Sequence, residues 1–541
     1  MSLNEGRYLP SFISTSRRKF ICRELYMVSK TGITRFERGK GTDMDRDPRP
    51  VLVLGATGYV GGRLVPLLLE RGWKVRAAGR SDRKIQGRPW GSHPNLEIVV
   101  ADALDTAVLT EAMRGCRAVF YLIHSVRPGE QDFATLDRRI AYSTVHAARE
   151  AGVDWIIHFT GLGNPAHLSD QLRSRYEVGE ILALGGARVT QLRAPLVLGS
   201  GGASFEMIQA FCGNLRVMFA PRWMDAKCQP IAIANVVEYL ASCLEHQETA
   251  GQVYEIGGPE VLTWRELFHI YAEEAGLPKR LVLVLPMRIH QISIGWMNLV
   301  TPVSVALIRP LVERMRDEIL CRDERIREVI PQKLLSCRDA ITKALGEVYR
   351  NEVASSCFDA GSTRLSEWAG GQDKAETRVF QDTFSITLDG PPELAWDVVK
   401  RIGGDTGWYF GTFLWRLRGF VDELLGGPGL SRGRRHVDSV AMGDHLDFWR
   451  VVAVEEHRHL LLRAEMLAPG EALLDFRVQV LPDGSTELRM TPSFVPRGFW
   501  GRIYWWIIAP SHSLMFKPML RQMVKAAGVR VLSGPSCVTE G

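Results

Sequence analysis

The sequence predicts an α/β fold with a doubly wound parallel sheet, followed by a separate α+β domain. Short runs rich in β-branched residues alternate with amphipathic segments in the first half, as is typical of a parallel sheet covered by helices. From residue 379 the rhythm changes to strands of alternating polarity and ends in one long helical tract. The predicted strands of the parallel sheet are Val51–Leu54, Lys74–Ala78, Leu96–Val100, Ala118–Ile123, Trp155–Phe159 and Arg188–Arg193.

A glycine-rich turn, Gly55-Ala56-Thr57-Gly58-Tyr59-Val60-Gly61, predicts a dinucleotide site between the first strand and the amphipathic segment that follows it. Gly55 allows the tight turn, Gly58 lets backbone N–H groups approach a pyrophosphate, and Gly61 lets the helix pack closely on the strand. We therefore expect the cofactor to contact the whole turn, including Thr57, Tyr59 and Val60. A glycine-rich turn without a ligand is the alternative.

The residues after the second predicted strand favour NADP(H) over NAD(H). A free ribose hydroxyl is usually held there by Asp or Glu, whereas the 2′-phosphate of NADP(H) needs positive charge. The sequence has Gly79-Arg80-Ser81 at this point, with no acid until Asp82. Arg80 is therefore the predicted phosphate clamp, and a solvated arginine at a strand end is the alternative.

The third and fourth predicted strands bring further candidates to the same edge, because the carboxyl ends of parallel strands lie side by side. Asp102 and Ala103 follow the third strand and are placed to contact the adenine ring. The fourth strand ends at Ile123 and delivers His124, and we expect both to line the cofactor site. His124 is a candidate for proton transfer, and a histidine bonded to backbone at a strand end is the alternative.

Several motifs follow along the chain: the strand end Thr160-Gly161, Tyr176 on the next helix, and Gly257-Gly258-Pro259 before a capping box, Thr263-Trp264-Arg265-Glu266. With the glycine turn they resemble the extended or atypical short-chain dehydrogenase/reductases. Longer runs resemble the NmrA-like bacterial NAD(P)-binding proteins that carry a C-terminal DUF2867 domain. These runs are Tyr121-Leu122-Ile123-His124-Ser125, Leu172-Arg173-Ser174-Arg175, residues 199–206 and Gln229-Pro230-Ile231. The resemblance begins at Pro50 and implies a Rossmann domain with a small substrate lobe.

In that family a Ser or Thr at the end of the fifth strand, a Tyr, and a Lys four residues after it carry the chemistry, with the Tyr as general acid/base. The resemblance assigns the first two roles to Thr160 and Tyr176. The position of the Lys is occupied by Glu180, a negative charge where the family has a positive one. In the lobe, Arg222, Trp223, Gln229 and Asn235 are expected to supply polar groups to a substrate pocket.

Three interpretations of the function stay open. The first is ordinary Tyr-dependent hydride transfer on a carbonyl or alcohol of a hydrophobic small molecule. The second is a reductase that works through His124 or a substrate-assisted proton transfer. The third is a protein that binds NADPH without turnover, as a sensor, chaperone or assembly factor whose C-terminal domain holds an apolar ligand or partner.

The second half predicts a START-like helix-grip domain, in which a curved sheet wraps the last helix. Its order is a strand, a short helix, further alternating strands and the helical tract Gly498–Ala527. That tract carries apolar residues that either pack on the sheet or hold a lipid or other hydrophobic ligand: Phe499, Ile503, Trp506, Ile507, Leu514, Phe516 and Met519. The predicted domains are a disordered basic tail (1–48), the NAD(P)-binding domain with its lobe (49–350), a linker (351–377), the helix-grip domain (378–530) and a flexible tail (531–541).

Composition excludes several classes of protein. Nine basic and three acidic residues among the first 40 account for the whole net charge of +6, so the folded part calls for no nucleic-acid partner. That tract lacks the apolar core of a secretory signal, and an organelle transit peptide or a start at Met44 are alternatives to a disordered tail.

The nine cysteines lack C-x-x-C spacing, which favours reduced thiols in a cytoplasmic protein and no metal site. No stretch reaches ~18 apolar residues, which leaves peripheral membrane contact open, and no oligomeric state is favoured.

Overall fold

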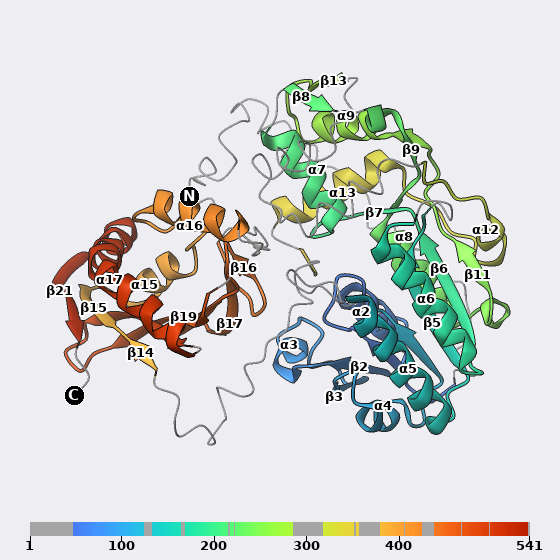
Figure 1. Ribbon diagram of the computed structural model, residues 1–541, viewed down its shortest axis with the longest axis horizontal. Helices are drawn as coiled ribbons and strands as arrows, with labels where there is room; N and C mark the ends of the chain where they lie inside the picture. Colours follow the sequence, from blue (N-terminus) through green and yellow to red (C-terminus); the bar gives the residue numbers. More distant parts are fainter. Residues whose placement is uncertain are drawn as a thin grey trace, which may run out of the picture.

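The computed structural model describes one large sheet in each half of the chain (Figure 1). The described residues are 47–123, 133–163, 168–214, 217–220, 222–284, 318–350, 353–355, 379–404, 406–424, 438–466, 468–496 and 498–538.

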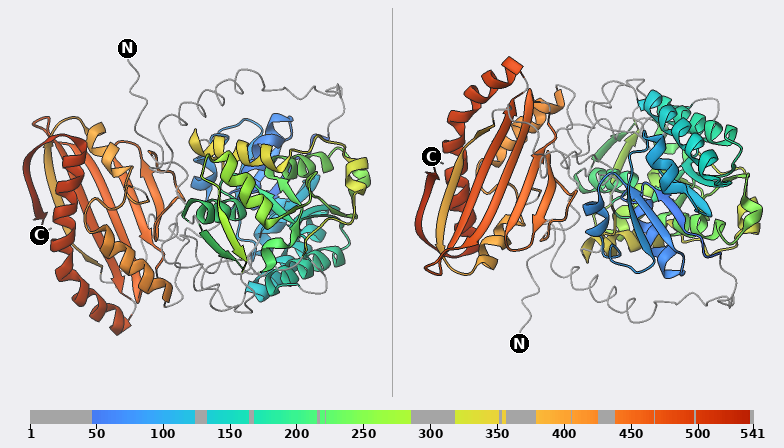
Figure 2. Two further views of the ribbon diagram at one scale, coloured as in Figure 1. Left: turned by 90° about the horizontal axis from the view of Figure 1, so that it is seen from above. Right: turned by 90° about the horizontal axis from the view of Figure 1, so that it is seen from below.

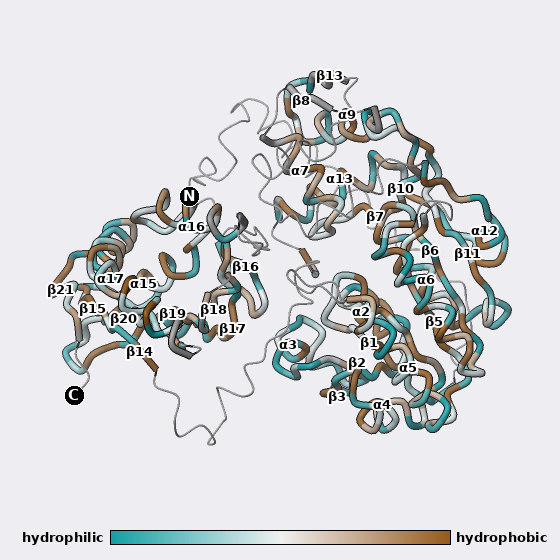
Figure 3. The backbone as a smooth tube through the Cα atoms, viewed as in Figure 1, coloured by the Kyte–Doolittle hydropathy of each residue, from teal (hydrophilic) through white to brown (hydrophobic). Residues whose placement is uncertain are grey.

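The first half holds a parallel sheet of the Rossmann type, as predicted. Its strand order is β11-β6-β5-β4-β1-β2-β3, with every neighbouring pair parallel. Hydrophobic residues run along these strands in Figure 3, because a parallel sheet is covered on both faces. The strands are β1 (Val51–Leu54), β2 (Val75–Gly79), β3 (Leu96–Val100), β4 (Ala118–Tyr121), β5 (Trp155–Gly161), β6 (Arg188–Ala194) and β11 (Val253–Glu255).

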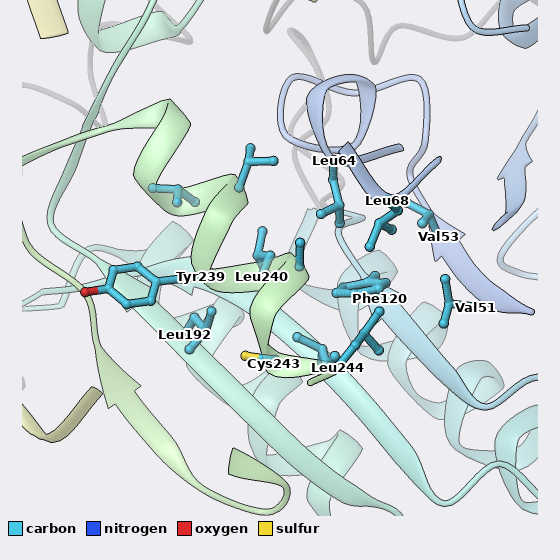
Figure 4. Packing of buried hydrophobic residues seen from close by; sticks show 14 of the residues in the cluster. Val51, Val53, Leu64, Leu68, Phe120, Leu192, Tyr239, Leu240, Cys243 and Leu244 are labelled. Atoms are coloured by element: carbon cyan, nitrogen blue, oxygen red, sulfur yellow. The ribbon is translucent and has the colours of Figure 1, made fainter. Parts of the chain in front are cut away.

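The two faces of this sheet bury different residues of β1. Val51 and Val53 belong to one core cluster, with residues of helices α2 and α8 such as Leu64 and Leu240 (Figure 4). The alternate residues of β1 belong to a second cluster, with residues of helices α4, α5 and α6. Asp105 caps α4 by accepting hydrogen bonds from two backbone amides. The helices are α2 (Gly61–Glu70), α3 (Asp82–Gln86), α4 (Thr106–Met113), α5 (Phe133–Ala151), α6 (Asp170–Leu184) and α8 (Ile233–Cys243).

A lobe with its own core cluster follows β6. The capping box predicted at Thr263 and Glu266 is present, with the two reciprocal hydrogen bonds that define it. Leu281–Val284 form strand β13, which pairs with β8, and residues 285–317 lie outside the described part. The elements are β7 (Leu196–Leu198), α7 (Ala203–Asn214), β8 (Val217–Ala220), β9 (Lys227–Cys228), β10 (Pro230–Ala232), β12 (Leu262–Thr263), α9 (Trp264–Glu274), β13, α12 (Arg325–Val329) and α13 (Cys337–Tyr349).

The second half holds an antiparallel sheet in the order β16-β17-β18-β19-β20-β15-β21, with β14 beside β20. Figure 2 shows the long helix α17, in red, lying along this sheet. Its inner side, which includes Phe516, Met519 and Met523, shares a core cluster with Trp396 and residues of the strands. The elements are β14 (Phe380–Gln381), β15 (Thr383–Asp389), α15 (Pro392–Val399), α16 (Thr412–Leu424), β16 (His445–Leu446), β17 (Trp449–Glu455), β18 (His459–Ala464), β19 (Gly470–Val480), β20 (Thr486–Pro496), α17 (Gly498–Ala527) and β21 (Arg530–Val538).

Two sequence predictions in this half need correction. The residues from 531 on were predicted to be a flexible tail, but Arg530–Val538 form β21, which pairs with β15. The apolar residues of α17 were predicted either to pack on the sheet or to hold a ligand; Trp506, Ile507 and Leu514 do not pack on the sheet, because they are exposed. The helix α16 was not predicted at all. None of the described helices is both long and apolar enough to span a bilayer.

Candidate functional site

The carbonyl oxygen of Gly55 lies at the centre of the glycine-rich turn. The Gly58 amide donates a hydrogen bond to it over 3.0 Å, and a Cβ on Gly58 would lie 3.3 Å from it. A Cβ on Gly61 would overlap the same oxygen. Gly55 itself has φ +90°, where a side chain is strained, and its Cβ would lie 3.0 Å from the carbonyl oxygen of Leu122. Gly55 and Gly61 are therefore required by the local geometry, and a side chain on Gly58 would make a tight contact with the turn.

The turn leads into the amino end of α2 in a form that suits an anion. The N-cap residue is Val60, which offers no capping side chain, and the first turn of the helix contains no acidic residue. The amide groups and the positive end of the helix dipole are therefore not neutralised by the helix's own side chains. This arrangement fits the pyrophosphate of a dinucleotide.

Residues distant in sequence also contact the turn, and no motif or spacing predicted these contacts. The buried guanidinium of Arg88 donates to the carbonyl oxygens of Thr57 (3.2 Å) and Ala354 (2.9 Å). The hydroxyl of Ser355 donates to the carbonyl oxygen of Tyr59 over 2.6 Å. Arg63 lies 4.6 Å from the centre of the Tyr59 ring and donates to the backbone oxygen of Ser355 over 2.8 Å.

The glycines of the run 199–206 accommodate the Tyr59 side chain. A Cβ on Gly199 or on Gly202 would lie 2.7 Å from the Tyr59 hydroxyl oxygen. Arg63 fixes the same run by donating to the backbone oxygen of Ser200 over 2.7 Å. This run therefore packs against the cofactor turn.

The predicted cofactor residues that the structure describes follow neighbouring strands of the sheet. Arg80 is exposed directly after β2, and Asp102 and Ala103 follow β3. Ile123 is half-buried after β4. Because β3, β2, β1 and β4 are consecutive neighbours and parallel, these residues and the glycine turn share one sheet edge. His124 lies outside the described residues.

Thr160 and Tyr176, the predicted catalytic residues, lie near the end of β5. Thr160 is buried, and its hydroxyl has no hydrogen-bond partner among the described residues. The Tyr176 phenol oxygen accepts a hydrogen bond from the Gly163 amide over 3.2 Å. Glu180, one turn after Tyr176, is exposed.

Arg193 lies beside Tyr176, and its place in the site was not predicted from the sequence. Its guanidinium lies 4.3 Å from the centre of the Tyr176 ring, and it pairs in register with Thr160 across β5 and β6. A cation thus accompanies the phenol although the expected Lys is absent. Only the alignment of two strands brings Arg193 there, so no spacing along the sequence indicates it.

A buried polar cluster lies beside Tyr176. Burial, with the positive charges of Arg175 and Arg193, lowers the pKa of His158 to about 3, so its ring is neutral near pH 7. The carboxylate of Asp137 accepts from the Ser174 hydroxyl over 3.1 Å. Like the Thr160 hydroxyl, three nitrogens here have no partner in the described part of the chain: Nδ1 of His158 and Nε of Arg175 and Arg193. Unpaired buried polar atoms are costly, so a polar guest or water is expected beside them.

Two of the four lobe residues predicted to line a substrate pocket, Gln229 and Asn235, make hydrogen bonds within the lobe. The Gln229 side chain donates to the Gly258 carbonyl (2.9 Å) and accepts from the Cys321 amide (2.9 Å). The Asn235 side chain donates to the Gln332 side chain (2.8 Å). Both amides connect segments of the lobe, and the side chains of Arg222 and Trp223 are not among those described. No cluster of three or more His, Cys, Asp or Glu side chains suited to a metal ion occurs in the described ranges.

Two family models match the chain. One is described as NAD(P)H-binding and matches residues 55–183; the other is described as a protein of unknown function, DUF2867, and matches residues 374–519. The first half is therefore an NAD(P)H-binding domain, and the second half carries a DUF2867 domain, as the sequence motifs indicated.

Among curated relatives, the chloroplastic divinyl chlorophyllide a 8-vinyl-reductase of Zea mays is 31% identical over 222 residues, 39% of this chain and 55% of the relative. Dihydroflavonol 4-reductase of Hordeum vulgare is 31% identical over 146 residues, 25% of this chain and 40% of the relative. The chain thus spans about half the length of these relatives. Among solved structures, the triphenylmethane reductase of Citrobacter sp. complexed with NADP(H) is 17% identical, with 55% of this chain and 99% of that chain covered and a TM-score of 0.45.

We expect Gly61→Ala to weaken NADPH binding by about tenfold or more and to destabilise the fold by about 1–3 kcal/mol, because the new Cβ meets a backbone carbonyl that cannot move aside. Thermal unfolding and NADPH titration measure both effects. The control is Gly346→Ala in α13, where the nearest atoms belong to the flexible side chain of Arg350. Unchanged binding and stability in Gly61→Ala would contradict the crowded turn.

We expect His158 to make the protein sensitive to acid. Between the unfolded pKa of about 6.5 and the folded pKa of about 3, only the unfolded imidazole binds a proton, so stability falls as pH falls through this window. From pH 8 to pH 5 this single group should cost about 2 kcal/mol. Urea unfolding at both pH values should show the loss reduced in His158→Gln and unchanged in His146→Gln, an exposed control. Equal losses in all three proteins would show that His158 is not buried as described.

Proposed function

Because the chain joins an NAD(P)H-binding domain to a DUF2867 domain, we propose that it is an NADP(H)-dependent oxidoreductase acting on a carbonyl/alcohol pair of a hydrophobic small molecule. The observation that carries this proposal is the group at the end of β5: the Tyr176 phenol with the Arg193 cation on its ring, beside the unpartnered Thr160 hydroxyl. Thr160 and Arg193 lie near the carboxyl ends of the neighbouring strands β5 and β6, at the same sheet edge as the glycine turn that follows β1.

The cofactor is held by groups of three chemical kinds. The glycine turn and the amino end of α2 would bind the pyrophosphate, Arg80 the 2′-phosphate, and Asp102 and Ala103 the adenosine. Asp82, the nearest acid after β2, accepts from the Arg83 amide over 2.7 Å at the start of α3. This carboxylate is therefore engaged locally, and Arg80 is the charge that would select NADP(H). When bound, the reduced cofactor supplies a hydride.

The chain's own residues would supply the proton and hold the substrate oxygen. The Thr160 hydroxyl donates a hydrogen bond to that oxygen, which fixes the carbonyl at the end of β5. The Tyr176 phenol transfers its proton to the same oxygen as negative charge develops there, and the product is the alcohol. The phenolate left behind is stabilised by the Gly163 amide and by the guanidinium of Arg193, and solvent returns the proton.

A protein that binds NADPH without turnover is the second candidate. Glu180 supports it, because this exposed acid stands where hydride-transferring relatives place the Lys. The two candidates differ in turnover, since both require the glycine turn to bind NADPH.

We expect Arg193→Gln and Tyr176→Phe each to lower turnover about 10²–10⁴-fold, because each removes part of the proton-transfer group. Arg193→Lys should restore most of the activity because it keeps the charge. The measurement is NADPH consumption against a panel of hydrophobic ketones and aldehydes. Arg188→Gln is the matched control, since Arg188 lies on the same strand and pairs on the surface with Asp154. Tight NADPH binding with no turnover in the wild type would favour the second candidate.

We expect Arg80→Ala to raise the Kd for NADPH at least about tenfold and to leave the Kd for NADH unchanged, because the 2′-phosphate, which NADH lacks, loses a charged partner. Arg83→Ala, a change to a second exposed arginine three residues on, is the control. Titration of both cofactors against the three proteins gives the result. The preference for NADP(H) is wrong if NADH binds the wild type as tightly as NADPH does.

A further inference from the structure

The outer side of α17 carries apolar and basic residues where a solvent-facing helix normally carries mixed charges. Trp506, Ile507 and Leu514 expose 69%, 71% and 76% of their surface. The inner side of the same helix is filled by other apolar residues, including Trp505 and Phe516, so the core does not need the exposed ones. Large apolar side chains gathered on one exposed face indicate a binding surface.

The basic residues of α17 continue the same side of the helix. Ile503, Trp506, Ile507, Pro510, Leu514, Lys517, Arg521 and Lys525 are separated by helical steps of one, three or four, which place them on one face. The first part of that face is apolar and the last part is basic. Within the 30 residues of α17 there is no Asp or Glu, while Arg502 adds a fourth positive charge. The helix therefore carries four positive charges and no negative one.

The neighbouring helix α16 adds a second exposed apolar face. It lies against α17, because the Arg418 guanidinium contacts the Tyr504 hydroxyl and the ring centres of Trp415 and Phe516 are 6.3 Å apart. Four of its apolar residues are exposed by 45–73%: Phe413, Leu414, Leu417 and Phe420. We call the exposed apolar residues of the two helices the α16–α17 face.

We propose that the α16–α17 face docks the protein on the surface of a bilayer that contains anionic phospholipid. Trp506, Ile507 and Leu514 would enter the boundary between headgroups and acyl chains, as apolar faces of interfacial helices do. Lys517, Arg521 and Lys525 would meet lipid phosphates, with their aliphatic stems on the apolar layer. The charge of α17 decides between occupants: a helix with four cations and no anion repels a second copy of itself and is complementary to an anionic surface.

The test is co-sedimentation of the full chain with vesicles of phosphatidylcholine, with and without phosphatidylglycerol. We expect binding to the anionic vesicles, weakened about fivefold for each charge removed in Arg521→Gln with Lys525→Gln, and weakened further by added salt. Trp506→Ser with Ile507→Ser should weaken binding about tenfold or more. The control is Val480→Ser, which changes an exposed apolar residue of β19 in the same domain and should bind as the wild type does.

Two outcomes would overturn the proposal. The first is equal sedimentation of the wild type with and without phosphatidylglycerol. The second is self-association in solution that disappears in Trp506→Ser with Ile507→Ser, because a second copy would then cover the face. All four substituted residues are exposed, and the circular dichroism spectrum and NADPH affinity of each variant establish that it is folded. Neither readout depends on turnover.

Discussion

The carbonyl oxygen of Gly55 is surrounded so closely that the backbone around it has little freedom. Gly58 donates a hydrogen bond to it, and Gly61 packs against it where any side chain would overlap. This contact sets how closely the start of α2 approaches the end of β1. The direction of the helix dipole, the exposed amides and the position of Tyr59 all follow from it. The Tyr59 ring in turn determines where glycines are needed at 199 and 202.

Local features of the sequence predicted the first half well. β1 and β3 have the predicted bounds, Thr263 caps the helix expected of it, and the strand alternation correctly predicted the parallel sheet. Each of these depends on residues within a few positions of one another, where propensity, capping and turn chemistry act. The candidate residues at the sheet edge could be predicted for the same reason, because the residues next to a strand in the sequence determine where the strand ends.

What the sequence did not predict depends on contacts between distant residues. Arg193 meets Tyr176 because β6 pairs with β5, and Arg88 meets Thr57 across 31 positions. Strand β21 exists because it completes the edge beside β15, although its own residues are largely polar or small. Helix α17 was misjudged for another reason. Both of its sides are apolar at the same helical spacing, so periodicity alone does not say which side faces the core.

Ser355 fixes the point at which the chain leaves the first half. Its hydroxyl is bonded to Tyr59, and the backbone oxygens of residues 354 and 355 accept from Arg88 and Arg63. A gene fragment that stops at residue 350 would thus remove acceptors from two guanidinium groups next to the cofactor turn. A first half that folds on its own therefore needs residues 354 and 355, so a split of the protein should fall after Ser355.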